Sequence, residues 1–175
     1  MDDSIEPVRS AQSGADRRTT VELWLRRLGV VVLLAVAVIA LFNVFGQRAT
    51  NAGARTPDAD LFVHAPTRLR SGLLFQAKLT VVAHRTLPNT TLVLGSGWID
   101  GLTLNTLEPS PSQETSGPGG SLALSLGTLQ AGARYTQYLE YQVNPTSSSS
   151  RSLVATVKSA GTPIVSVHRT LTIWP

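Results

Sequence analysis

Two patterns of apolar and polar positions divide the chain. Residues 28–46, with the sequence LGVVVLLAVAVIALFNVFG, are almost entirely apolar and carry no charge. As a helix rising about 1.5 Å per residue they would reach about 28 Å, close to the bilayer's hydrocarbon thickness of about 30 Å. A helix in the core of a soluble protein would show a polar face, which this segment lacks. We therefore predict one transmembrane helix that contacts membrane lipid through residues 28–46.

From residue 61 onward apolar and polar residues alternate with a period of two, which is typical of strands. The longest run places one set of residues on a buried face: Leu73, Phe75, Ala77, Leu79, Val81 and Ala83. Its partners on the exposed face are Gln76, Lys78, Thr80 and His84. Shorter runs follow, separated by turns rich in Gly, Pro and Asn. Seven to nine such strands predict an all-β fold, an antiparallel sandwich of two sheets.

These patterns predict four segments. Residues 1–19 form a disordered cytoplasmic tail, and residues 20–46 form a juxtamembrane and transmembrane helix. The helix is expected to begin near Thr20, because Thr19–Glu22 fits a capping box. Residues 47–60 are small, polar and without pattern, so we predict a linker, and residues 61–175 form the β-sandwich.

Charge around the apolar segment predicts its orientation. Four arginines precede the segment, and fewer basic residues follow it before two acids: Arg17, Arg18, Arg26 and Arg27 before, then Arg48, Arg55, Asp58 and Asp60 after. Positive flanks stay in the cytoplasm. We therefore predict a single-pass protein of the cell membrane with a cytoplasmic N-terminus and an extracytoplasmic C-terminal domain.

A cleaved signal peptide is the alternative to an anchor. Ala52-Gly53-Ala54 has the small-x-small form that a signal peptidase recognises. Cleavage after Ala54 would release a secreted domain that starts at Arg55. The apolar run is longer than the 7–15 residues of a typical signal sequence, which favours a retained anchor.

Composition narrows the possible functions. The chain has 175 residues, with 15 Lys and Arg against 11 Asp and Glu. The basic residues are scattered along the β region, so we predict no nucleic-acid partner. The sequence has no cysteine, which excludes disulfides and thiolate chemistry.

Catalytic and metal-binding motifs are also missing from the sequence. His64, His84 and His168 stand in no metal-ligand spacing, and Gly95-Ser96-Gly97 lacks the form of a nucleophile elbow. We predict no catalytic residue, no metal ligand, no cofactor and no small-molecule substrate, and hence a protein that is not an enzyme.

Several turn and strand markers carry a family resemblance. They are Ser71-Gly72, the corner Trp98-Ile99-Asp100-Gly101-Leu102, the turn Leu126 to Gly132, and the closing Leu171-Thr172-Ile173-Trp174-Pro175. Over roughly residues 61–175 the chain resembles immunoglobulin-like domains of bacterial envelope proteins, most nearly the DUF11 (conserved repeat) type. The resemblance implies an immunoglobulin-like sandwich that acts as a spacer, adhesion module or assembly part, and it brings no catalytic residues. The domain occurs once rather than in tandem, and the stretch 101–111 is longer than such a corner needs.

Exposed aromatic residues are the best sequence guide to a binding surface. Trp98 stands in a Gly-rich corner, and Tyr138 falls on the strand face opposite Tyr135 and Tyr141. We expect a partner-binding edge in residues 95–111, made of Trp98, Ile99, Asp100, Leu102, Pro109 and Pro111. Tyr and Trp are enriched at interfaces, and end loops of sandwiches commonly carry recognition. The alternative is that Trp98 plugs the end of the core.

The sequence thus favours a non-catalytic module of the cell envelope that binds or assembles with another membrane or envelope protein. A structural spacer without a specific partner is the alternative function. An enzyme whose site forms only in three dimensions is the third hypothesis.

The predicted orientation can be tested by cysteine labelling in this cysteine-free chain. On intact cells, a membrane-impermeant maleimide should label Ser148→Cys and leave Ser10→Cys unlabelled. The reverse pattern would contradict the orientation inferred from flanking charge.

Overall fold

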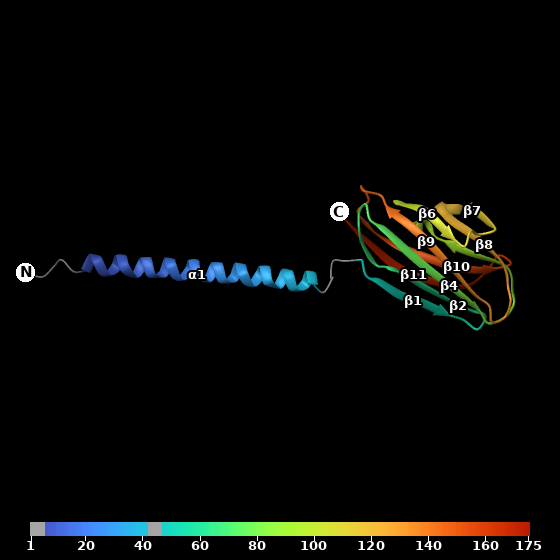
Figure 1. The fold of residues 1–175 in the computed structure, drawn as a ribbon, viewed down its shortest axis with the longest axis horizontal. Coiled ribbons are helices and arrows are strands. Elements are labelled where there is room, and N and C mark those ends of the chain that lie inside the picture. Colours follow the sequence, from blue (N-terminus) through green and yellow to red (C-terminus); the bar gives the residue numbers. More distant parts are fainter. Residues whose placement is uncertain (1–5, 42–46) are drawn as a thin grey trace, which may run out of the picture. The chain divides into compact units, whose positions relative to one another are not determined.

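The computed structural model describes residues 6–41 and 47–175, with the backbone alone for residues 6–20. The chain consists of two units, Met1–Phe45 and Gly46–Pro175 (Figure 1). The first unit contains helix α1, and the second contains the β domain.

Helix α1 spans Glu6–Leu41. It begins inside the stretch predicted to be a disordered tail, and it passes through Thr20, where a helix start was expected. Residues 6–19 contain Ala, Arg, Glu and Gln, which favour helix, and Pro7 lies in the first turn, where proline is tolerated. Its part Val21–Leu41 is long and apolar enough to cross a membrane. Residues 42–46 of the predicted span lie outside the described residues.

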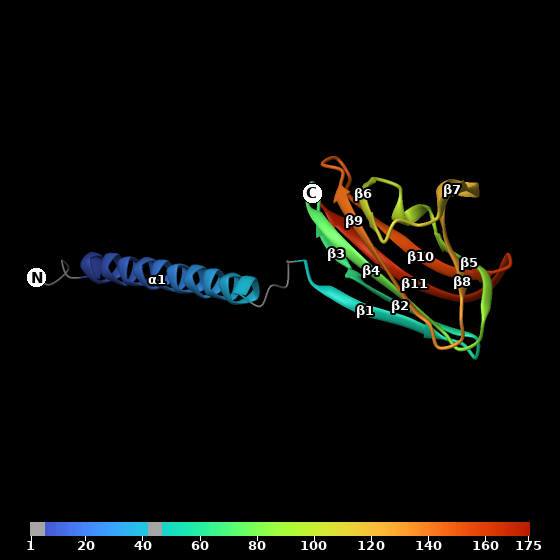
Figure 2. The same cartoon turned by 45° about the vertical axis from the view of Figure 1, so that its right-hand side comes forward.

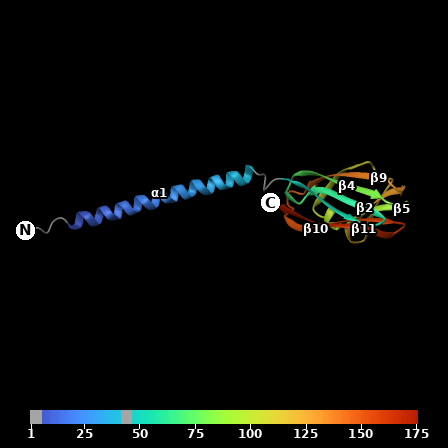
Figure 3. The same cartoon turned by 90° about the horizontal axis from the view of Figure 1, so that it is seen from below.

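The described β domain contains eleven strands in two sheets. Sheet one has the order β1-β2-β4-β9-β6, with bounds Ala49–Arg55, Ala59–Pro66, Leu74–Ala83, Arg134–Val143 and Leu102–Glu108. Sheet two has the order β3-β11-β10-β5-β8-β7, with bounds Arg68–Arg70, Thr162–Trp174, Ser149–Ser159, Leu87–Leu94, Ser121–Leu129 and Gln113–Gly117. Figure 3 shows β2, β4 and β9 in one layer and β10 and β11 in the other. All the pairings are antiparallel except that of β3 with β11.

This architecture confirms the predicted immunoglobulin-like sandwich, and alternation along β4 shows why. Phe75, Ala77, Leu79, Val81 and Ala83 are buried between the sheets. Gln76 and Lys78 are exposed, as their positions in the alternation require, whereas Thr80, also expected to be exposed, is buried. Leu73 was expected on the buried face, but it precedes β4 in a turn and is 40% exposed.

The predicted linker contains a strand, so that prediction was wrong for most of residues 47–60. Strand β1 pairs antiparallel with β2 in continuous register from Ala49↔Pro66 to Arg55↔Asp60, and the two run side by side in Figure 2. Ala52 and Ala54 are partly buried and pack against the core. Alanine and glycine have weak strand preference, so this strand depends on its tertiary partners rather than on its own sequence.

Arg169 of β11 supplies much of that tertiary support. This side chain lies in sheet two and reaches into sheet one, and the residue is only 7% exposed. Its Nη1 donates to the carbonyl oxygens of Thr50 and Val63 at 3.0 and 2.9 Å. Its Nη2 donates to Thr50 Oγ1 and to the Ala65 carbonyl at 2.8 and 2.7 Å. Burial lowers the pKa of Arg169. The guanidinium therefore ties β1 and β2 to β11 and closes one edge of the sandwich.

Removing β1 tests this arrangement. A chain of residues 55–175 should be less stable than residues 47–175 by at least about 3 kcal/mol, because Arg169 would keep its buried charge and lose the two acceptors on Thr50. Urea unfolding measures the difference. A chain that starts at Ala49, which keeps all of β1, serves as the control and should match residues 47–175. Equal stability of all three chains would show that β1 is dispensable.

Candidate interaction surface

Trp98, the predicted anchor of a binding edge, is fully buried. The 3-10 turn η1 (Ser96–Trp98) lies against β10, where a Cβ on Gly97 would collide with the Ser152 carbonyl oxygen. Gly95 N–H also donates to the Val154 carbonyl at 2.9 Å. This close backbone approach, possible only for glycine, turns the indole inward.

The indole packs in an aromatic cluster in the core. Its ring centre lies 6.1 Å from that of Tyr141, which stacks at 5.2 Å on Phe75. Burial raises the pKa of Tyr141. Trp98 thus fills the end of the core, and the prediction that it forms part of an exposed binding edge was wrong.

The other predicted site residues are divided between core and surface. Leu102 is buried and Ile99 packs partly against the core, whereas Asp100 and Pro109 are exposed and Pro111 is half-buried. The extra length of residues 101–111 forms β6, an edge strand of sheet one that pairs with β9. The structure therefore does not bring these six residues to one surface, although Pro109 lines a groove described next.

A row of polar side chains crosses the outer face of sheet one. Cross-strand pairing aligns one residue from each strand, in the order Asn51, His64, Lys78, Tyr138 and Glu108. All five are exposed. His64 Nδ1 lies 2.5 Å from Asn51 Oδ1, and Lys78 Nζ lies 5.6 Å from the centre of the Tyr138 ring. The row places an aromatic ring between a basic side and an acidic side.

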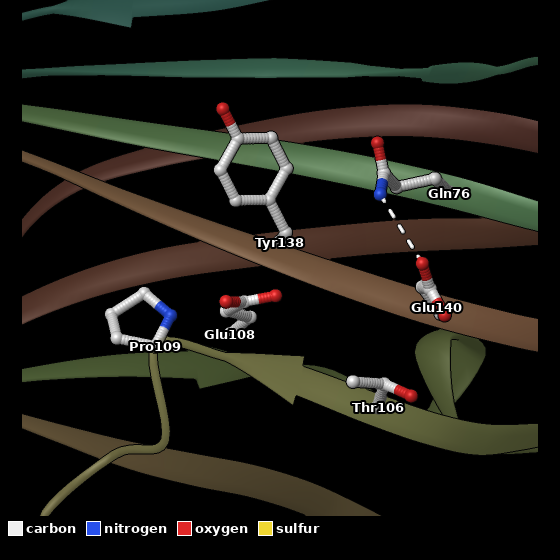
Figure 4. A pocket seen from close by; sticks show the side chains of 6 residues that line it. All are labelled: Gln76, Thr106, Glu108, Pro109, Tyr138 and Glu140. Carbon is white, nitrogen blue, oxygen red and sulfur yellow. Dashed lines mark hydrogen bonds between the residues drawn. The ribbon is translucent and has the colours of Figure 1, made fainter.

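A groove of about 480 Å³ lies on the acidic side, over β4, β9 and β6. Its lining residues are Gln76, Thr106, Glu108, Pro109, Tyr138 and Glu140 (Figure 4). Gln76 Nε2 donates to Glu140 Oε1 at 3.5 Å. Figure 4 shows the Tyr138 ring on one side of the groove, with the Glu108 carboxylate and Pro109 close by.

A second hollow of about 550 Å³ lies on the basic side of the same face. It is lined by Asn51, Phe62, His64, Lys78, Thr80 and Arg134. Phe62 packs over Gly53 of β1, and the Arg55 guanidinium carbon lies 5.5 Å from the Phe62 ring centre. Strand β1 therefore supplies part of the surface as well as closing the domain.

Gln137, which the sequence did not single out, fixes the rim of the groove. It precedes Tyr138 on β9 and points inward, fully buried. Its Nε2 donates to the Pro109 carbonyl at 2.9 Å, and its Oε1 accepts from Tyr135 Oη at 3.0 Å. The loop after β6 is thereby attached to β9, so Pro109 and Tyr138 are held in fixed relation.

The described residues hold no group of three His or acidic side chains able to bind a metal ion. The three histidines are exposed, as predicted from their positions on strand faces or in loops. His84 Nε2 contacts Asp60 Oδ1 at 3.0 Å, and His168 lies on β11 of sheet two.

Comparison with known proteins identifies no family: no family model and no curated protein matches the chain. Membership of the DUF11 type is therefore not shown. Solved structures do resemble the chain. AvmM, described as catalysing macrocyclisation in alchivemycin A biosynthesis, has 9% identity and a TM-score of 0.49 over 74% of this chain and 95% of its own.

Two further solved structures have similarly low sequence identity and TM-scores. The CARDB domain of the PF1109 protein of Pyrococcus furiosus, in complex with di-metal ions, has 13% identity and a TM-score of 0.44 over 71% of this chain and 95% of its own. CaCohA2 of Clostridium acetobutylicum has 12% identity and a TM-score of 0.41 over 61% and 86%. Similarity at this level says nothing about a shared activity.

Two aromatic substitutions test the division between core and surface. Trp98→Ala should cost about 3–5 kcal/mol of unfolding free energy, because it leaves a large cavity beside Tyr141. Tyr138→Ala removes an exposed ring and should cost about 1 kcal/mol or less. Urea unfolding of residues 47–175 gives both values, and comparable costs would contradict the burial described above.

Proposed function

We propose that this chain is a membrane-anchored, extracytoplasmic module of the cell envelope that binds a partner protein and is not catalytic. The observation that carries the proposal is the outer face of sheet one. There an aromatic ring lies between a basic hollow and an acidic groove on a rigid sheet.

The size and openness of this face favour a protein partner. The aligned row extends over all five strands of sheet one. Adjacent strands are about 4.8 Å apart, so the row spans roughly 19 Å, much wider than a small molecule needs. Tyrosine is one of the residue types enriched among the energetically important residues of protein interfaces. A surface on strands also needs little ordering upon binding, which reduces the entropic cost of association.

Helix α1 and strand β1 support retention of the anchor. The helix has the length and composition of a membrane span. The alternative cleavage site, after Ala54, lies inside β1, next to the last residue of that strand. Cleavage there would remove Thr50, which accepts two of the hydrogen bonds from Arg169. The residues just before the cleavage site belong to β1 and are part of the folded domain. Cleavage would therefore damage the domain, which favours a chain that keeps its helix.

Co-purification tests the proposed function. Full-length chain from gently solubilised membranes should retain a partner protein at fixed stoichiometry. Tyr138→Ala should lose most of that partner, because the ring lies between the groove and the hollow of the proposed surface. His168→Ala, a change at an exposed strand position in sheet two, is the matched control and should retain it.

A spacer without a specific partner would give a different result. It would bring no stoichiometric protein, and the Tyr138 and His168 variants would behave alike. That outcome would contradict the proposed function.

A further inference from the structure

The groove and the hollow on the outer face of sheet one differ in the charge of their lining residues, although Asp60 of β2, paired with Arg55 and His84, also lies on this face. Glu108 and Glu140 line the groove, and Lys78 and Arg134 line the hollow together with His64. Opposite charges on neighbouring strands stabilise a sheet, whereas like charges close together destabilise it. Within the described part of the chain, the ion pairs are Arg55–Asp60, His84–Asp60 and Arg85–Asp58, and none of them involves Glu108, Glu140, Lys78 or Arg134. Their charges are therefore available to a molecule outside the domain.

The groove has the chemistry of an arginine site. Glu108 pairs directly with Tyr138 across the strands, and Glu140 follows two residues later on the same face of β9. Glu108 and Glu140 are therefore diagonal neighbours on adjacent strands, about 7–8 Å apart. Their two carboxylates lie on either side of the Tyr138 ring. A guanidinium stacks on an aromatic face and donates hydrogen bonds from a planar fork, which suits this combination. Lys78 Nζ, 5.6 Å from the ring centre, shows that a cation is compatible with this ring.

The hollow has the complementary chemistry of a carboxylate site. Lys78 and Arg134 are exposed donors from neighbouring strands, and its other lining residues include no acid. Lys78 and Glu108 belong to the same cross-strand row, with Tyr138 between them. Two strand spacings separate them, which is roughly 10 Å.

We propose that the partner presents a protein segment carrying an arginine and an acidic residue roughly 10 Å apart. The arginine enters the groove between Glu108 and Glu140 against Tyr138, and the acidic residue binds Lys78 and Arg134. In an extended segment this separation corresponds to about three residues, at about 3.3 Å each. The inference rests on the proposed function and specifies the partner of that surface.

A small probe tests the groove without the partner. N-acetyl-arginine methylamide is titrated into the full-length chain in detergent, and the Tyr138 ring resonance is followed by NMR and assigned with Tyr138→Phe. The resonance should shift saturably with a Kd of about millimolar order, as expected for one side chain. Glu108→Gln combined with Glu140→Gln should abolish the shift. Glu114→Gln, on β7 of sheet two, is the matched control and should keep it.

Charge reversal tests the whole surface with the co-purified partner. Glu108→Lys with Glu140→Lys should lower partner retention by about tenfold or more, as should Lys78→Glu with Arg134→Glu. Glu114→Lys, the matched control, should retain the partner as the unaltered chain does. Retention should also weaken as salt rises, because exposed charges are screened.

The outcomes separate this inference from the proposed function. Absence of any partner from the unaltered chain contradicts the proposed function. In that case the arginine titration still shows whether the groove binds an arginine side chain. A partner retained equally by both charge-reversed variants overturns the inference and leaves the function standing. An arginine probe that shifts the Tyr138 resonance equally with and without Glu108 and Glu140 overturns it too.

Discussion

The guanidinium of Arg169 is the contact on which the arrangement of this domain depends. It belongs to sheet two, yet its acceptors are the backbone carbonyls of β1 and β2 and the hydroxyl of Thr50 in sheet one. A buried cation is costly unless its hydrogen bonds are satisfied. Two of the four acceptors belong to Thr50, so part of this cost is offset only while β1 stays in register beside β2. One side chain therefore couples the edge of one sheet to the other, and it makes the first strand after helix α1 part of the fold.

Alternation along the chain was sufficient to predict the sandwich, because burial on one face and water on the other impose a period of two. Leu79 and Lys78 of β4 illustrate the success: adjacent in sequence, they lie on opposite faces as expected. Strand β1 was missed because Ala52, Gly53 and Ala54 carry no apolar pattern. Its stability comes from pairing with β2 and from Arg169, which lies more than a hundred residues later in the chain. The pattern of residues within β1 contains no information about this distant partner.

Only part of the candidate surface could be predicted from the sequence. Tyr138 was identified because it alternates with Tyr135 and Tyr141, and it is exposed where they are not. Trp98 was misplaced because an aromatic residue among glycines has two interpretations: an exposed corner, or a turn lying tightly against another strand. Gly97 lies so close to the Ser152 carbonyl that the second interpretation, a turn packed against another strand, is the correct one. The grouping of Glu108 with Glu140, and of Lys78 with Arg134, depends on strand order, which alternation does not reveal.

Strand β1 also has a mechanical consequence. Along the chain it is the first strand after helix α1, so tension transmitted from the helix enters the domain at the start of β1. An edge strand pulled from one end would ordinarily peel away one residue pair at a time. The hydrogen bonds from Arg169 hold Thr50, the second residue of this strand, to the opposite sheet. Peeling must therefore begin beside a residue that is bonded to both sheets, so the domain resists detachment where a pull along the chain arrives.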